Sequence, residues 1–295
     1  AKEIRVLSML FRLLGRLPLP LNHRLGAWLG WLAWMFSARH RRLTRENLAR
    51  YARATGIVNI EPLVRAAISE QGKGMSELAV AWVAPLEQIY GMVRQCSGWQ
   101  HVEAAKKNDR AIIFVTPHLG CYDIAGRYLE SRIPVTALYR PPKLKSLEPI
   151  MQQGRIRGGG NTAAADAGGV RTLLKTLKSG GNIVILPDQV PAPEQGGDGV
   201  WADFFGEPAY TMTLLPRLAR SADAEVLFFF AERLPAGAGY HVHIMPPLEP
   251  FADDKAASAA QTNHMVEALI RLEPAQYLWG YNRYKHPAGA PPRPV

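Results

Sequence analysis

The chain is poor in cysteine. Only Cys96 and Cys121 occur among its 295 residues, which is too few for a disulfide framework. The pair also lacks zinc-ligand spacing. His241 and His243 alternate in a predicted strand, but no third ligand follows at a suitable spacing. The sequence therefore predicts a protein of a reducing compartment, with no metal site and no cofactor.

Long hydrophobic runs and nucleotide-binding loops are also lacking. The apolar run from Leu25 to Phe36 is shorter than the roughly 20 residues that a transmembrane helix needs. No small-residue cleavage site follows this run, so we do not expect a signal peptide. The glycines at 158–160 belong to neither a G-x-G-x-x-G pattern nor a Walker motif, which argues against nucleotide binding.

Acidic residues are fewer than basic ones. The 25 Asp and Glu residues against 35 Lys and Arg residues give a formal net charge of +10 and a pI near 9.7. This balance suits an acidic partner, such as a phospholipid surface, a phosphorylated substrate or an acidic carrier protein. We expect no nucleic-acid partner, because the basic residues are interleaved with apolar runs and no nucleic-acid-binding module is present.

Residues 1–50 combine basic and apolar character. Three tryptophans fall between Leu25 and Phe36, and the basic stretch ARHRR follows at once. Tryptophan beside arginine is typical of helices that lie in the membrane interface. We therefore predict membrane-associating helices here. The alternative is a buried helix with a basic flank.

Four segments are predicted along the chain. They are the membrane-associating helices (1–50), a helical region (51–98), an α/β core (99–286) and a loose proline-rich tail (287–295). Apolar residues recur at helical spacing over 61–83, and short apolar runs predict strands at 111–115, 134–138, 182–186, 225–231 and 240–245. The fold class predicted is α/β, with a mostly parallel or mixed central sheet flanked by helices.

The central motif spans a predicted strand-to-helix turn. His118 follows the strand at 111–115, Asp123 lies in the first turn of the next helix, and Gly120 frees the turn between them. In this arrangement the two side chains can face each other. A carboxylate beside an imidazole fixes its tautomer, so His118 is predicted to act as a general base oriented by Asp123. The alternatives are an ordinary polar turn, or Cys121 as a nucleophile at the helix start.

A family resemblance rests on several stretches beyond this pair. TPHLGCYD resembles the H-x-x-x-x-D/E motif of the glycerolipid-type acyltransferases. With ARHRRLTRENLARY, the arginines after YRPPK, LPDQVP, VWADFFGEPAYT and QYLWGYNRYKHP, nearly the whole chain resembles the lipid A biosynthesis acyltransferases of the lauroyl and myristoyl type. Many relatives have Glu at the position of Asp123, so this chain has a shorter reach there.

The resemblance implies an O-acyltransferase. Its donor would be acyl carrier protein, its acceptor a phosphorylated lipid A precursor, and its place the cytoplasmic face of the bacterial inner membrane, against the membrane lipids. It also implies substrate-binding roles, which we assign to Arg140, Arg155, Arg157, Asp188 and Gln189. Backbone N–H groups near Gly120, or an arginine, are expected to stabilise the oxyanion.

Two alternatives stay open at this point. The first is an acyltransferase of the same fold that acts on a lysophospholipid or another glycolipid. The second is a peripheral membrane-binding protein without catalysis. The sequence leaves open the acyl chain length, the acceptor hydroxyl, the choice between acyl carrier protein and coenzyme A, and the oligomeric state. VWADFFGEPAY is interpreted either as the lining of an acyl groove or as core.

Overall fold

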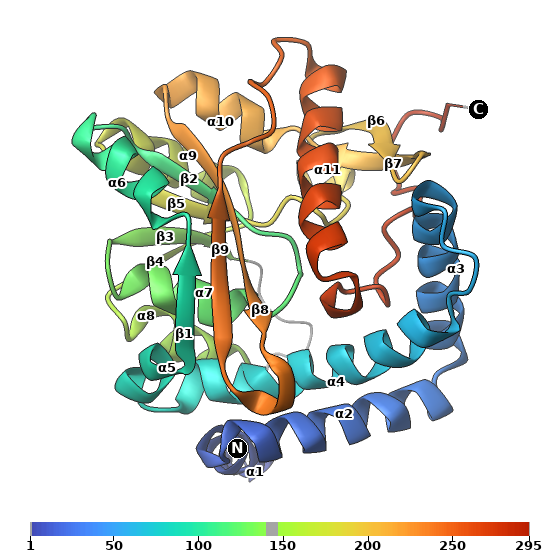
Figure 1. The fold of residues 1–295 in the computed structure, drawn as a ribbon. Helices are drawn as coiled ribbons and strands as arrows, with labels where there is room; N and C mark the ends of the chain where they lie inside the picture. Colours follow the sequence, from blue (N-terminus) through green and yellow to red (C-terminus); the bar gives the residue numbers. More distant parts are fainter. Residues whose placement is uncertain (1, 140–146, 295) are drawn as a thin grey trace.

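A central sheet organises the protein in a computed structural model that describes residues 2–139 and 147–294 (Figure 1). Within these residues seven strands pair in the order β1-β9-β8-β2-β5-β3-β4. All neighbours are parallel except β8 and β9, which are antiparallel. The strands are β1 (Val93–Ser97), β2 (Ile112–Val115), β3 (Val135–Tyr139), β4 (Asn161–Ala164), β5 (Asn182–Ile185), β8 (Glu225–Arg233) and β9 (Tyr240–Met245).

Helices cover both faces of the sheet, which explains the apolar character of its central strands. All four residues of β2 are buried, because Ile113 and Val115 face one core while Ile112 and Phe114 face the other. The first core includes side chains of α9 (Ala167–Lys178), α10 (Leu214–Ala222) and α11 (Lys255–Leu272). The second includes side chains of α5 (Leu86–Met92), α6 (Trp99–Lys107), α7 (Tyr122–Glu130) and α8 (Glu148–Ile156).

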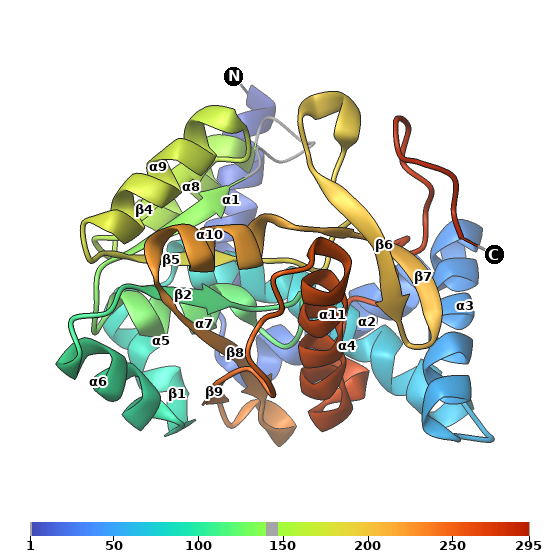
Figure 2. The same ribbon diagram turned by 90° about the horizontal axis from the view of Figure 1, so that it is seen from above.

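A separate hairpin packs against α11. Strands β6 (Gly199–Phe204) and β7 (Glu207–Met212) are antiparallel, and they lie on the far side of the molecule from β1 and α6 (Figure 2). Phe204 and Phe205 are buried in the first core, so this part of the aromatic stretch is core. The tail contacts this hairpin, since Trp201 Nε1 donates to the carbonyl of Pro291 at 2.9 Å.

Four long helices precede α5 and the first strand of the sheet in the described part of the chain. They are α1 (Lys2–Arg16), α2 (Leu19–Phe36), α3 (Ala38–Thr55) and α4 (Glu61–Val83). Helix α2 lies along α4 (Figure 1) and the two backbones touch at glycines. A Cβ atom on Gly72 would lie 2.1 Å from the carbonyl oxygen of Gly26 and 2.6 Å from the nitrogen of Gly30. Among the described residues, no helix is both long and apolar enough to cross a bilayer.

Most predicted elements are found, with shifted ends. The mostly parallel sheet flanked by helices is confirmed, and the helix predicted over 61–83 coincides with α4. Strands β1 and β4 were not predicted, and β1 precedes residue 99, where the α/β core was expected to begin. Helix α10 begins only at Leu214, because Thr211 still pairs with Val200 in the hairpin. Short 3-10 turns lie at Pro193–Gln195, Pro235–Gly237 and Pro274–Gln276, the last of which is η4.

Candidate active site

The turn between β2 and α7 is held by backbone contacts on two sides. The N–H of Cys121 donates to the carbonyl of Ala231 on β8 at 2.9 Å, and the N–H of Gly120 donates to the carbonyl of Gln276 in η4 at 3.2 Å. Gly120 has φ of 58°, and a Cβ there would lie 2.0 Å from the oxygen of Ala231. Only glycine fits this close approach, so Gly120 allows the turn to follow this path.

His118 is bound to a carboxylate at the end of the neighbouring strand. Its Nδ1 lies 2.8 Å from Oδ1 of Asp188, and its backbone N–H donates to Oδ2 at 2.9 Å. Asp188 is buried, and burial acts to raise the pKa of its carboxyl. The charge and hydrogen bonds of His118 more than offset burial, so this pKa lies below its ordinary value.

This pairing sets the tautomer of the imidazole. An ionised carboxylate only accepts hydrogen bonds, so Nδ1 carries the hydrogen and Nε2 carries the lone pair. The side-chain nitrogen of Gln189 lies 3.1 Å from Nε2, where it can donate to that lone pair. The imidazole of His118 therefore presents a proton-accepting nitrogen on the side away from Asp188.

Asp123 has a different partner from the one predicted. Its Oδ1 accepts from Arg155 on α8, at 3.2 Å from Nη2 and 3.3 Å from Nε. Its Oδ2 is buried and has no hydrogen-bond partner among the described residues. Burial acts to lower the pKa of the Arg155 guanidinium, but the carboxylate of Asp123 outweighs it and the pKa is raised. Asp123 therefore forms an ion pair with Arg155, and Asp188 is the carboxylate that orients the imidazole of His118.

One cavity nevertheless connects the two residues of the motif. His118 and Asp123 both line a cavity of about 130 Å³. Met75 and Leu78 of α4 provide apolar wall, and Tyr277 comes from the segment after η4. His118 and Asp123 therefore border the same space, although their side chains do not contact each other, and Arg155 contacts Asp123 without lining this cavity.

The other predicted arginines lie in different surroundings. Arg157 donates from Nη2 to the carbonyl of Ala81 at 3.1 Å, and with Arg12 it lines a separate cavity of about 590 Å³ between α1, α4 and α8. Burial lowers the pKa of Arg157, and the nearby charge of Arg127 lowers it further. Arg140 lies outside the described residues.

Two chemical expectations change with the structure. The N–H groups of Gly120 and Cys121 already donate to carbonyls, so neither is free for an oxyanion. Burial raises the pKa of the Cys121 thiol well above its ordinary value, and the charge of Glu77 raises it further. Although Cys121 lies at the helix start, burial keeps its thiol neutral, and a neutral thiol is a poor nucleophile.

The contact between Asp188 and His118 could have been predicted from one feature of the sequence, the position of each residue after a predicted strand. Asp188 and Gln189 follow the strand at 182–186 as His118 follows the strand at 111–115. Parallel strands bring such residues together at one edge of a sheet, but only if the strands are neighbours. The sequence did not give the strand order, in which β2 pairs directly with β5.

Comparisons with known proteins agree on one family. The chain is 29% identical over 281 residues to the lipid A biosynthesis lauroyltransferase of Escherichia coli K12, covering 94% of this chain and 90% of the relative. It is 27% identical over 272 residues to the palmitoleoyltransferase of that strain, covering 92% and 87%. It is 24% identical to the myristoyltransferase, covering 88% and 78%.

The family model covers nearly the whole chain, including every element that positions His118 and Asp188. The model for the bacterial lipid A biosynthesis acyltransferases matches residues 6–286. The turn between β2 and α7, His118 and Asp188 all lie inside this match. On this evidence of sequence and extent, the chain belongs to the bacterial lipid A biosynthesis acyltransferase family.

Proposed function

We propose that the protein transfers a fatty acyl chain from the thioester of acyl carrier protein to a hydroxyl group of a lipid A precursor. The observation that carries the proposal is the His118–Asp188 pair at the carboxyl edge of the sheet. Family membership supports acyl transfer as the reaction. The net charge of +10 suits both an acidic carrier protein and a phosphorylated acceptor.

In this mechanism His118 is the general base. Its Nε2 takes the proton of the acceptor hydroxyl while Nδ1–H stays bonded to Asp188. The hydroxyl oxygen attacks the thioester carbonyl carbon and forms a tetrahedral intermediate. The C–S bond then breaks, the new ester forms, and the imidazolium returns its proton to the leaving thiolate. Asp188 keeps its charge throughout and stabilises the imidazolium.

The remaining predicted residues surround this centre. Gln189 caps Nε2 and would move aside for the acceptor hydroxyl. Asp123 borders the cavity, and Arg155, which is bonded to Asp123, is proposed to contribute positive charge that stabilises a developing oxyanion. Arg157 lines the larger cavity with Arg12, and two guanidinium groups there suit a phosphate of the acceptor. Arg140 stays a predicted substrate contact from the sequence alone.

The reaction is tested with purified protein in detergent micelles. Acyl-loaded carrier protein and a tetra-acylated lipid A precursor should give a mass gain of one acyl chain, which the His118→Ala variant should not give. Acyl coenzyme A replaces the carrier protein in a parallel reaction to identify the donor. Product only with lysophospholipid would change the acceptor, and no product with any acceptor would favour a binding protein.

The protein is further proposed to lie on the cytoplasmic face of the inner membrane through α1 and α2. Exposed apolar side chains form a stripe at helical spacing along α2, including Leu21, Trp28, Trp31 and Met35. Phe36 at the end of α2 is 81% exposed. Met9, Leu10 and Leu13 on α1 are also exposed. A patch of this kind in a basic protein suits shallow insertion among anionic lipids.

A variant of this stripe should lose membrane binding. Replacing Trp28, Met35 and Phe36 together by glutamine should reduce partition onto liposomes with anionic lipid by about tenfold or more, because each side chain contributes apolar burial. The measurement is flotation in a density gradient. The matched control replaces Val58 and Leu248, which are exposed elsewhere, by glutamine. Equal loss in both variants would refute the α2 stripe as the membrane face.

A further inference from the structure

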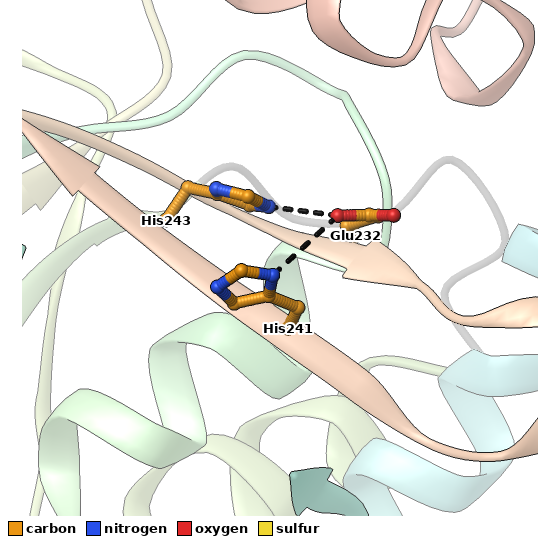
Figure 3. A group of neighbouring side chains, drawn as sticks. All are labelled: Glu232, His241 and His243. Atoms are coloured by element: carbon orange, nitrogen blue, oxygen red, sulfur yellow. Dashed lines mark hydrogen bonds and ion pairs between the residues drawn. The ribbon is translucent and has the colours of Figure 1, made fainter. Parts of the chain in front are cut away.

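A second cluster of chemically active side chains lies on the β8–β9 hairpin. Glu232 on β8 is paired in register with His241 on β9, and His243 lies two residues further along β9. Residues two apart on a strand point to the same face, so the three side chains converge there (Figure 3). The sequence offered no third ligand for the two histidines, because Glu232 reaches them only through strand pairing.

The donor atoms of these residues are close enough to share one ion. His243 Nε2 lies 2.8 Å from Oε2 of Glu232, and His241 Nδ1 lies 3.8 Å from the same oxygen. All three donor atoms lie within 4.8 Å of one another. A tetrahedral zinc ion holds nitrogen and oxygen ligands about 3.3 to 3.5 Å apart. Small side-chain rotations reach this geometry, with the ion replacing the proton between His243 and Glu232.

Neighbouring groups hold the rings in ligand orientations. Ser97 Oγ lies 2.8 Å from Nε2 of His241, which leaves Nδ1 to face Glu232. The ring of Phe230 stacks on His243 with 4.8 Å between centroids and 12° between planes. A hydrogen bond at the second nitrogen of a liganding histidine is the usual support for a metal site. The three side chains are about one-fifth exposed, so an ion and water can reach them.

From this convergence we propose that Glu232, His241 and His243 bind a divalent transition-metal ion of the zinc class, with water completing the coordination. Two imidazoles and one carboxylate form a ligand set that zinc accepts in proteins. The site is separate from the cavity that holds His118. The two residues that flank Glu232 hold the turn between β2 and α7. The carbonyl of Ala231 accepts from the N–H of Cys121, and Arg233 donates to the carbonyl of Gly120 at 2.7 Å. The ion would therefore brace the hairpin that supports this turn.

Zinc and cobalt titrations of the untagged full-length protein test this proposal. Calorimetry with Zn²⁺ should give one ion per chain, and Co²⁺ should give the visible d–d bands of a site of low coordination number. Free Zn²⁺ at one hundred times Kd should raise the folded-to-unfolded ratio about 100-fold, measured as a higher Tm. Absence of both the 1:1 binding and the cobalt bands would overturn the proposal without any variant.

Variants then assign the ligands. His243→Gln and Glu232→Gln should each weaken Zn²⁺ binding by at least about tenfold, because each removes a ligand. His264→Gln is the matched control, since His264 is exposed on α11 and outside the cluster. Circular dichroism without metal checks that each variant is folded. If a folded ligand variant binds Zn²⁺ as tightly as the wild type and the control, the site lies elsewhere.

Discussion

Replacing Asp188 with asparagine should lower kcat for acyl transfer about 10³- to 10⁴-fold, nearly as much as removing His118 itself. Asp188 accepts from the Nδ1–H of His118 at 2.8 Å. An asparagine amide placed there would donate to Nδ1 and hold the imidazole in the opposite tautomer. Nε2 would then carry a hydrogen and could not accept the proton of the substrate.

The matched variant for this prediction is Asp123→Asn. Asp123 contacts Arg155 at 3.2 Å and is not hydrogen-bonded to His118, so its loss should act through Arg155 and the cavity wall. We expect a smaller fall in kcat, together with a change in KM. The double variant His118→Ala/Asp188→Asn should be no slower than His118→Ala alone, because residues that act as one unit are not additive.

The comparison between the two carboxylates separates two mechanisms. Both variants are assayed with acyl carrier protein and the lipid A precursor across a pH range. If Asp123→Asn loses most of the activity while Asp188→Asn keeps it, then His118 turns to Asp123 during the reaction. In that case the sequence-based pairing of His118 with Asp123 would be the catalytic one.

Local sequence patterns predicted helices and strands far better than they predicted contacts between residues distant in the sequence. The period of apolar residues located α4 at Glu61–Val83, and buried β-branched runs located β2 and β5. Each of these signals resides within one segment. Strand β4, with the sequence NTAA, has no β-branched run and half of its residues are exposed, so its formation depends on pairing with β3.

The site illustrates the same difference. The spacing from His118 to Asp123 favoured a partner close in sequence, and the turn does bring both residues to one cavity. The carboxylate that contacts the imidazole is 70 residues away, because β2 and β5 are neighbours in the sheet. Glu232 joins His241 through the β8–β9 register in the same way. Contacts of this kind depend on topology, which one sequence does not encode locally.

The second large effect is expected at a buried ion pair that connects the N-terminal helices to the turn between β2 and α7. Arg233 donates from Nε to Glu77 of α4 at 2.7 Å and from Nη2 to the carbonyl of Gly120 at 2.7 Å. Glu77 also accepts from Tyr240 at 2.8 Å and lies 2.7 Å from Nε2 of His23 on α2. One fully buried carboxylate thus joins α2, α4 and the β8–β9 hairpin.

The charge state of Glu77 makes this pair sensitive to acid. Burial acts to raise its pKa, but Arg233 and His23 more than offset burial and lower the pKa to about 2. Because the folded pKa lies below the ordinary value of 4.5, Glu77 contributes stability above that value. This contribution should be lost progressively as the pH falls from about 4.5 towards 2.

Replacing Arg233 with methionine should therefore lower the free energy of unfolding at pH 7 by about 3 to 5 kcal/mol, because it leaves a buried carboxylate without its main partner. Denaturant unfolding monitored by circular dichroism gives this value, and acyl transfer by the folded fraction reports the lost contact to Gly120.

The double variant Glu77→Gln/Arg233→Met should recover much of the stability, since no buried charge remains unpaired. Arg50→Met is the matched control, because its partner Glu207 is partly exposed and such pairs contribute about 1 kcal/mol or less. A loss at Arg233 no larger than the loss at Arg50 would show that the buried pair does not hold α4 to the turn.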